Sequence, residues 1–181
     1  MGAFRKRRGR VLAAVVSVLA LGIASVAVAD VVTGTNGADN LVGTNGPDTI
    51  NALSGPDTVR ALAGDDDVNG GFGDDRISGG GGNDVINGGW GADTILSPDD
   101  DTVSDRVEQL IGGGGNDTIL QRDGADPASE SVLSGGLGAD TLNAADGDGN
   151  DTLDGGAGPF DVCIGDPGDT YVGCETVDDG T

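Results

Sequence analysis

The sequence predicts an all-β fold in which short strands recur every nine residues and stack into a regular coil. The main observation is a period of nine. Seven consecutive blocks fill residues 34–96, each with Gly at position four, Asp at position six and an aliphatic residue at position eight. The composition agrees, because 36 of the 181 residues are glycine and 3% are aromatic, which leaves little for a conventional globular core.

The first 29 residues are expected to be a secretory signal peptide. A basic cluster at residues 5–10 precedes an apolar run from Val11 to Val28, and small residues lead up to a cleavage point before Asp30. A retained membrane anchor is the alternative, because the apolar run is just long enough to span a bilayer. The export route, general secretory or twin-arginine, stays open. The mature chain is expected to be secreted, extracellular or at the cell surface, with no membrane span after leader removal.

Removal of the leader leaves a strongly acidic chain. Residues 30–181 contain 31 acidic residues and four basic ones, which is a net charge of −27. Such a surface repels phosphate, so a nucleic-acid partner is excluded. The sequence contains no histidine, which excludes histidine-based catalysis and His-ligated zinc or haem. Self-repulsion at this charge density opposes a compact state unless a cation neutralises it.

Each block of the contiguous region, residues 30–96, combines a turn with a brief strand. Glycine permits positive φ angles and close backbone packing in the turn, and tails such as Thr49-Ile50-Asn51 suit a strand. Side chains alternate along a strand, so position eight points to one face. If two blocks form one coil, successive strands lie on opposite sides and their aliphatic residues meet between them. These residues are Leu41, Ile50, Val59, Val68, Ile77, Ile86 and Ile95.

The same two-block coil places the position-six aspartates in two rows, one along each edge. Seven aliphatic side chains are too few to offset the entropy of ordering the whole repeat, and stacked carboxylates repel one another. The rows therefore need a counter-ion. Calcium suits them, because this hard cation takes many oxygen ligands in flexible geometry, whereas magnesium demands a strict octahedron. One row is expected to hold Asp39, Asp57, Asp75 and Asp93, and the other Asp48, Asp66 and Asp84.

The blocks resemble the GGxGxDxUx nonapeptide of RTX, or haemolysin-type, calcium-binding repeat proteins. Residues 79–87 match it fully, and the resemblance covers residues 34–96 continuously and most of 112–154. It implies a calcium-stabilised parallel β-roll, a form of β-solenoid, with each ion held between blocks n and n+2 by Asp carboxylates and backbone carbonyls. About five ions are expected in the contiguous blocks. The implied carbonyl donors are Gly34, Asn36, Gly37, Gly43, Asn45, Gly46, Gly70, Gly73, Gly79, Gly82, Gly88 and Gly91.

The repeats are interrupted beyond residue 96. Residues 97–111 are interpreted as a polar insertion that leads into a strand docked on the next coil. The triplet Asp99–Asp101 within it is interpreted as a solvated loop, with a separate metal site as the alternative. Residues 112–154 contain interrupted repeats. Their position-six residues are further candidate calcium ligands: Asp117, Asp140 and Asp151.

The last segment, residues 155–181, departs from the repeat and is expected to form a cap. It contains the two cysteines of the chain, Cys163 and Cys174. In an exported protein without histidine they are expected to form a disulfide, with a metal or redox role as the alternative. Such a bridge would close the open end of the roll, which otherwise exposes unpaired strand edges.

Three aromatic residues have expected structural roles. Phe160 stands where the repeat has Asp, and Asp161 follows one residue late. Phe160 and Tyr171 are expected to cover the last aliphatic layer. Trp90, in the turn of the seventh block, is expected to pack on the nearby insertion, with a carbohydrate or partner contact as the alternative.

Three functions fit these observations. The leading hypothesis is an exported, non-enzymatic protein that binds calcium ions, with binding coupled to folding. The second is a structural or adhesive surface protein that uses the roll as a spacer or as a face for a protein or surface-polymer partner, which the sequence does not identify. The third is an accessory remnant of an RTX enzyme or toxin. The sequence supplies no pocket-bearing scaffold or sugar-binding platform for glycosidase chemistry.

Overall fold

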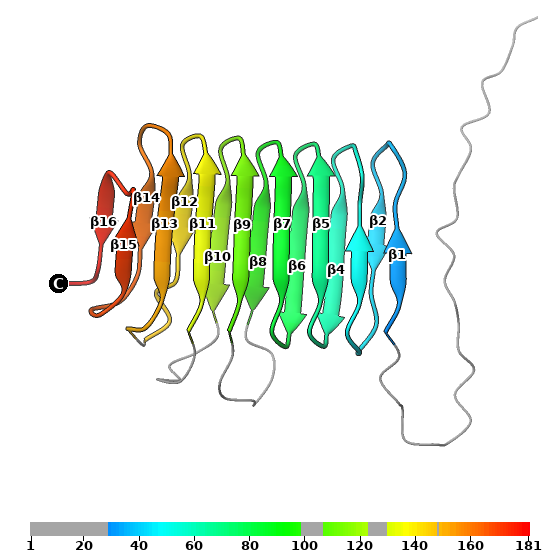
Figure 1. Ribbon diagram of the computed structural model, residues 1–181, viewed down its shortest axis with the longest axis horizontal. Coiled ribbons are helices and arrows are strands. Elements are labelled where there is room, and N and C mark those ends of the chain that lie inside the picture. The colour runs from blue at the N-terminus through cyan, green and yellow to red at the C-terminus, as the bar shows by residue number, and fades with distance from the viewer. Residues whose placement is uncertain (1–28, 99–106, 123–129, 148) are drawn as a thin grey trace, which may run out of the picture.

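The computed structural model describes residues 29–98, 107–122, 130–147 and 149–181, which form a parallel β-roll with no helix among them (Figure 1). Sixteen strands alternate between two eight-stranded sheets, the odd-numbered strands in one and the even-numbered strands in the other. The predicted fold class is confirmed. The strands are β1 Val31–Thr33, β2 Asn40–Val42, β3 Thr49–Asn51, β4 Thr58–Ala63, β5 Asp67–Phe72, β6 Arg76–Gly81, β7 Val85–Trp90, β8 Thr94–Pro98, β9 Gln109–Gly114, β10 Thr118–Arg122, β11 Val132–Leu137, β12 Thr141–Asn143, β13 Thr152–Ala157, β14 Val162–Ile164, β15 Thr170–Val172 and β16 Thr176–Asp178.

Two blocks make one coil, as the sequence predicts. Ile50 on β3 pairs with Val68 on β5, which pairs in turn with Ile86 on β7, so equivalent residues lie 18 positions apart. The register survives the first interruption, because Ile95 on β8 pairs with Ile119 on β10. Strand β9 continues the other sheet past the interruption, with Leu110 beside Ile86.

A single line of aliphatic side chains fills the space between the sheets. All seven predicted core residues point inward, and none is more than 4% exposed. Strand alternation and the two-block coil therefore place them as expected. The line continues through the interrupted half of the roll with Leu110, Ile119, Leu133, Leu142, Leu153 and Cys163, each 0% exposed.

The third and fourth blocks keep the backbone path of the repeat although they begin Ala-Leu instead of Gly-Gly. Leu53 and Leu62 adopt φ angles of 78° and 93° at the position where Gly71 and Gly89 adopt 104° and 108°. A left-handed φ costs a non-glycine residue about 1–2 kcal/mol. The stacked coils impose the conformation on these leucines.

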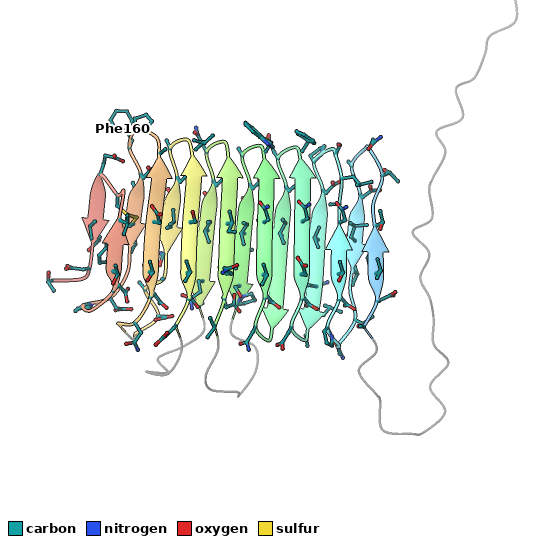
Figure 2. All side chains as sticks on the ribbon, viewed as in Figure 1. Phe160 is labelled. Atoms are coloured by element: carbon teal, nitrogen blue, oxygen red, sulfur yellow. A yellow bond between two sulfur atoms is a disulfide. The ribbon has the colours of Figure 1, made fainter. Side chains whose placement is uncertain are left out.

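The C-terminal segment closes the roll with a disulfide between Cys163 and Cys174. Tyr171 is partly buried against the core, as expected, whereas the expectation for Phe160 is wrong. Phe160 is 77% exposed with a φ of 72° and projects from the upper end of the roll in Figure 2. The core position of this coil is taken by Cys163 instead, because the turn contains one extra residue.

Two regions for which the sequence makes predictions lie outside the described residues. They are residues 1–28 of the expected leader and the Asp99–Asp101 triplet of the insertion. In the part of the chain that is described, no helix has the length and apolar character needed to cross a membrane.

Candidate calcium sites

A row of carboxylates lies in the turns that lead from each odd-numbered strand to the next even-numbered strand. These turns form the upper end of the roll in Figure 1. From Asp39 to Asp161, each backbone N–H in this upper row donates to a carboxylate oxygen of the next coil. For example, Asp57 N–H donates to Asp75 Oδ1 and Asp75 N–H to Asp93 Oδ1, both at 2.8 Å. The upper row consists of Asp39, Asp57, Asp75, Asp93, Asp117, Asp140, Asp161 and Glu175.

The upper row runs unbroken past both interruptions of the repeat. Asp93 N–H donates to Asp117 Oδ1, and Asp117 N–H donates to Asp140 Oδ1, although these pairs are 24 and 23 residues apart. The reason is topological. The interruptions separate β8 from β9 and β10 from β11, so the short turns from odd to even strands are untouched. Blocks that are separated in the sequence therefore become neighbours in the roll.

Asp161 is a member of the upper row that the nine-residue frame does not predict. Asp140 N–H donates to Asp161 Oδ1 at 2.8 Å, and Asp161 is 0% exposed. Its own N–H donates to Glu175 Oε2 at 2.7 Å, which extends the row to the cap. The signal in the sequence is the carboxylate displaced by one residue, which indicates a one-residue insertion in the turn rather than loss of the carboxylate.

A lower row lies at the opposite end, where the even-numbered strands end. In its first half Asp48 N–H donates to Asp66 Oδ1 at 2.7 Å, and the same pattern returns where Ser131 N–H donates to Asp151 Oδ1 at 2.8 Å. The nine-residue period predicts only Asp48, Asp66 and Asp84 along this edge. The full lower row consists of Asp30, Asp48, Asp66, Asp84, Glu108, Ser131, Asp151 and Asp169.

Glu108 and Ser131 replace aspartate where the two interruptions rejoin the lower row. Their carbonyls accept backbone hydrogen bonds from Val132 and Thr152 at 2.9 Å, as the aspartate carbonyls of other coils do. Gln121 Nε2 donates to Ser131 Oγ at 3.4 Å, and these polar side chains are at most 1% exposed. The lower row therefore changes its chemistry at the interruptions, whereas the upper row keeps its carboxylates.

The second carboxylate oxygen of the buried aspartates points into the turn. In the described residues Oδ2 has no hydrogen-bond partner at Asp57, Asp66, Asp75, Asp93, Asp117, Asp140 and Asp161. Burial without a partner is costly for a carboxylate oxygen. These atoms are therefore available to a cation.

Backbone carbonyls converge on the same space, which glycine leaves open. A Cβ built on Gly70 would lie 2.6 Å from Asp75 Oδ2 and 2.5 Å from the carbonyl oxygen of Gly88, one coil further on. A Cβ on Gly88 would likewise lie 2.5 Å from Asp93 Oδ2 and 2.8 Å from Gly112 O. Carboxylate and carbonyl oxygens of successive coils thus share a cradle, a donor set that suits calcium.

The first two blocks satisfy their aspartates differently. Thr35 donates to Asp39 Oδ2 from its N–H at 2.5 Å and from its hydroxyl at 2.8 Å. Thr44 N–H donates to Asp48 Oδ2 at 2.5 Å in the same way. The residue at position two therefore determines whether the inner carboxylate oxygen has a protein donor.

Comparison with known families identifies the repeat. A profile of the RTX calcium-binding nonapeptide repeat, comprising four copies, matches residues 33–68, 42–77, 60–95, 99–126 and 132–159. The chain belongs to the RTX calcium-binding repeat family. No curated protein and no solved structure matches the chain. In the described ranges no three acidic or cysteine side chains come together as a metal-binding group.

Burial in the RTX turns shifts the aspartate pKa values upward. Desolvation raises the pKa of Asp66 to about 7 and the pKa values of Asp75, Asp93 and Asp117 to about 6. The N–H donated by the preceding coil lowers each pKa, and neighbouring carboxylates raise it. Desolvation also raises the pKa of Asp140. The folded turns thus disfavour the charged carboxylates unless a cation is present.

The glycines that the RTX resemblance implies as carbonyl donors fall into two structural groups. Gly34, Gly43, Gly70, Gly79 and Gly88, at position one, each face Oδ2 of the aspartate in their own block. Gly73, Gly82 and Gly91, at position four, stack closely on the backbone of the preceding coil, whereas Gly37 has no preceding coil beneath it. Asn36 and Asn45 are exposed turn residues. The carbonyls of Ala52, Ala61, Gly112, Gly135 and Gly155 also lie in the cradles, although the sequence analysis did not select them.

Proposed function

We propose that this protein is an exported calcium-binding protein whose roll folds when calcium is bound. The observation that carries the proposal is the set of buried Oδ2 atoms that lack hydrogen-bond partners among the described residues. At Asp75, Asp93, Asp117, Asp140 and Asp161, a backbone carbonyl of the neighbouring coil lies in the same turn. Calcium would supply the positive charge that these oxygens lack, and it would bind them as ligands. The chain's own contribution is to hold the oxygens in register through N–H to Oδ1 bonds between coils.

The proposal places about five ions in the contiguous blocks. Asp39 and Asp48 remain candidate ligands there, although threonine already donates to each of them. Continuity of the upper row extends the proposal to Asp117 and Asp140, and adds Asp161 as a ligand. The remaining candidates are Asp57, Asp66, Asp75, Asp84, Asp93 and Asp151.

Export follows from the expected leader at residues 1–29 and agrees with the disulfide, which oxidising compartments favour. Low calcium before export would leave the acidic chain unfolded, and external calcium would fold it. We therefore place the mature protein outside the cell or at its surface. The proposal gives it no catalytic role, since a chain without histidine lacks the commonest acid–base residue.

A second candidate function is that of a structural or adhesive surface protein. It is favoured by three large apolar side chains exposed along one sheet: Phe72, Trp90 and Leu137. A calcium-filled roll would then serve as the rigid support of that surface. The third hypothesis, a remnant of an enzyme or toxin, has no such observation in its favour.

Calcium titration of the purified protein tests the leading proposal. Circular dichroism should show a cooperative gain of β-structure at millimolar calcium, and calorimetry should count several bound ions. Magnesium at the same concentration is the control and should produce little change, because its octahedral geometry does not fit carbonyl-rich turns. A protein that is equally compact in excess chelator would contradict the proposal.

A further inference from the structure

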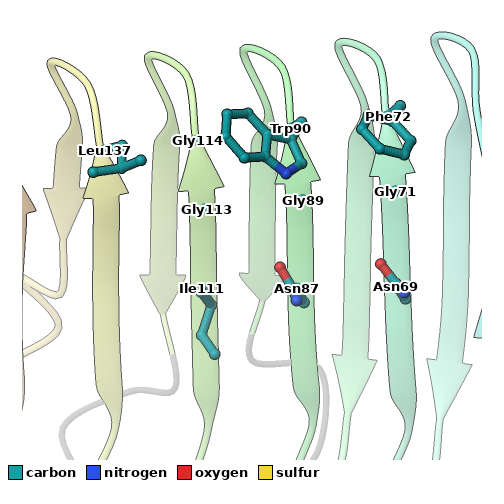
Figure 3. Close-up of a pocket in the computed structure, with 10 residues that line it drawn as sticks. All are labelled: Asn69, Gly71, Phe72, Asn87, Gly89, Trp90, Ile111, Gly113, Gly114 and Leu137. Carbon is teal, nitrogen blue, oxygen red and sulfur yellow. The ribbon is translucent and has the colours of Figure 1, made fainter.

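A shallow trough crosses the outer face of the odd-numbered sheet. It has a volume of about 420 Å³ and is lined by residues of β5, β7, β9 and β11. Its upper wall is formed by Phe72, Trp90 and Leu137, which are 62%, 60% and 52% exposed. Figure 3 shows the two rings side by side at the ends of β5 and β7, with Asn69 and Asn87 lower on the same strands.

The register of the sheet builds this trough. Phe72 pairs with Trp90, and Asn69 pairs with Asn87, so an aromatic row and an amide row run parallel along the roll axis. Adjacent strands lie about 4.8 Å apart. Among the described residues, no hydrogen bond involves the side-chain amide of Asn69 or of Asn87. The trough thus repeats the same pair of groups, a ring and an amide, at each of two successive coils.

Glycine forms the floor and fixes the indole ring. Gly71, Gly89 and Gly113 lie between the two rows, so bare backbone is exposed there. A Cβ built on Gly114 would lie 3.0 Å from Trp90 Cε3 and 3.2 Å from Cζ3, so the indole packs on the backbone of Gly114. Trp90 is expected to pack on the nearby insertion, most of which lies outside the described residues; the contact that the structure describes is with Gly114 on β9. One face of the ring is supported by the sheet, and the side chain is pre-oriented.

None of the described residues that line the trough is charged, in a chain whose net charge is −22. A cationic ligand would be drawn to the carboxylate rows at the ends of the roll, and an anionic ligand would be repelled by the molecule as a whole. Flat rings beside free amides favour a ligand with apolar C–H faces and neutral hydroxyl groups. Such a ligand can stack on the rings and hydrogen-bond to the amides at once.

We propose that the trough binds a neutral oligosaccharide lying along the roll axis. Successive sugar units would stack on Phe72 and Trp90, and Asn69 and Asn87 would hydrogen-bond to their hydroxyls. The row continues through Gly114 to Leu137, which leaves room for a further unit beyond the indole. The even-numbered sheet and the two carboxylate rows play no part in this site.

Trp90 is the only tryptophan in the chain, so its fluorescence reports on the trough directly. The calcium-loaded protein is titrated with cellohexaose, chitohexaose, xylohexaose and mannohexaose, and with hexagalacturonate as the anionic counterpart. At least one neutral hexasaccharide should give a saturable spectral shift at millimolar concentration or below, and hexagalacturonate should not. Phe72→Ala should weaken binding about tenfold through loss of one stacking platform. Gly114→Ala should have a similar effect, because the new methyl displaces the indole.

Phe160→Ala is the matched control, since it removes a phenyl ring that is even more exposed than Phe72 and lies outside the trough. It should leave the titration unchanged. Circular dichroism of each variant in calcium verifies the fold, so a failed sugar titration is separate from a failure of calcium binding. The proposal is overturned if no neutral hexasaccharide produces a saturable response. It is also overturned if hexagalacturonate binds equally well, or if sedimentation shows that Trp90 instead mediates self-association.

Discussion

Glycine at position four is required because each turn stacks directly on the turn of the preceding coil. Gly73 has a φ of 130°, and a Cβ built on it would lie 2.6 Å from the carbonyl carbon of Gly55. Gly37 holds the same position in the first coil, where a Cβ would meet nothing within 4 Å. The same residue type therefore has a steric role in one coil and none in the other.

Gly73→Ala should destabilise the calcium-loaded protein by about 2–4 kcal/mol, because left-handed strain and a backbone clash add together. Gly37→Ala should change stability by less than about 0.5 kcal/mol. Urea denaturation in saturating calcium measures both variants. Equal effects of the two substitutions would show that stacking does not explain the glycine.

Asp75 allows the charge of a proposed ligand to be separated from its structural hydrogen bond. Asp75→Asn keeps an oxygen for the N–H of Asp57 but removes the negative charge beside Gly88 O. We expect the loss of about one bound ion, or about a tenfold weaker site. Asp39→Asn should have a smaller effect, because Thr35 already donates to Asp39 Oδ2. Calcium calorimetry distinguishes them, and an unchanged Asp75→Asn isotherm would remove Asp75 from the proposed sites.

At the scale of the element, strands β14, β15 and β16 depend on the cap. Cys163 belongs to the core of β14, and the disulfide joins it to Cys174 between β15 and β16. The bridge also holds Glu175 beside Asp161, where Glu175 Oε2 accepts the N–H of Asp161 and its own N–H donates back to Asp161 O. The last rung of the upper row is thus tied to the covalent closure of the roll.

Reduction of the disulfide should destabilise the cap by about 3 kcal/mol, which is the entropic contribution to the free energy expected when a disulfide closes a loop as short as that between Cys163 and Cys174. In a stacked repeat protein this loss should be local, because each coil contacts only its neighbours. Hydrogen exchange with mass spectrometry should therefore show faster exchange at residues 162–178 and little change at residues 49–72. Uniformly faster exchange along the whole chain would contradict local coupling.

At the scale of the whole molecule, proton binding and calcium binding should oppose one another. Without calcium, the raised pKa values of Asp66, Asp75, Asp93 and Asp117 mean that the folded state binds more protons than the unfolded chain. Proton binding by these four aspartates stabilises the folded state. This stabilisation is fully present below about pH 4, the pKa in the unfolded chain, and is lost as the pH rises through the folded-state pKa values of about 6–7. With calcium the carboxylates must be ionised, so acid weakens binding.

Acidification from about pH 7.5 to pH 5 should therefore increase β-structure in excess chelator but lower the melting temperature in limiting calcium. Circular dichroism at both pH values, with and without calcium, measures the two trends. A titration in sodium chloride controls for general screening of the acidic chain. The same direction of change in both conditions would show that the buried aspartates do not control the response.

The fold was predictable because one pattern determines several levels of structure. The period of nine and the aliphatic residue at position eight correctly predict the two-sided coil and its core from Leu41 to Ile95. The disulfide was also predictable, since the chain has two cysteines and an expected leader. The place of Phe160 was not, because a one-residue insertion shifts the strand register and moves Cys163 into the core.

The sequence by itself determined the repeat, the acidic character and the aspartates of the contiguous blocks, because these depend on spacing along the chain. Only the tertiary structure decided that the upper row continues through Asp117, Asp140 and Asp161, and that Glu108 and Ser131 enter the lower row. It also brought Phe72 and Trp90 side by side on an open face. The physical reason is that coil stacking sets neighbours by strand register, which both interruptions of this chain preserve.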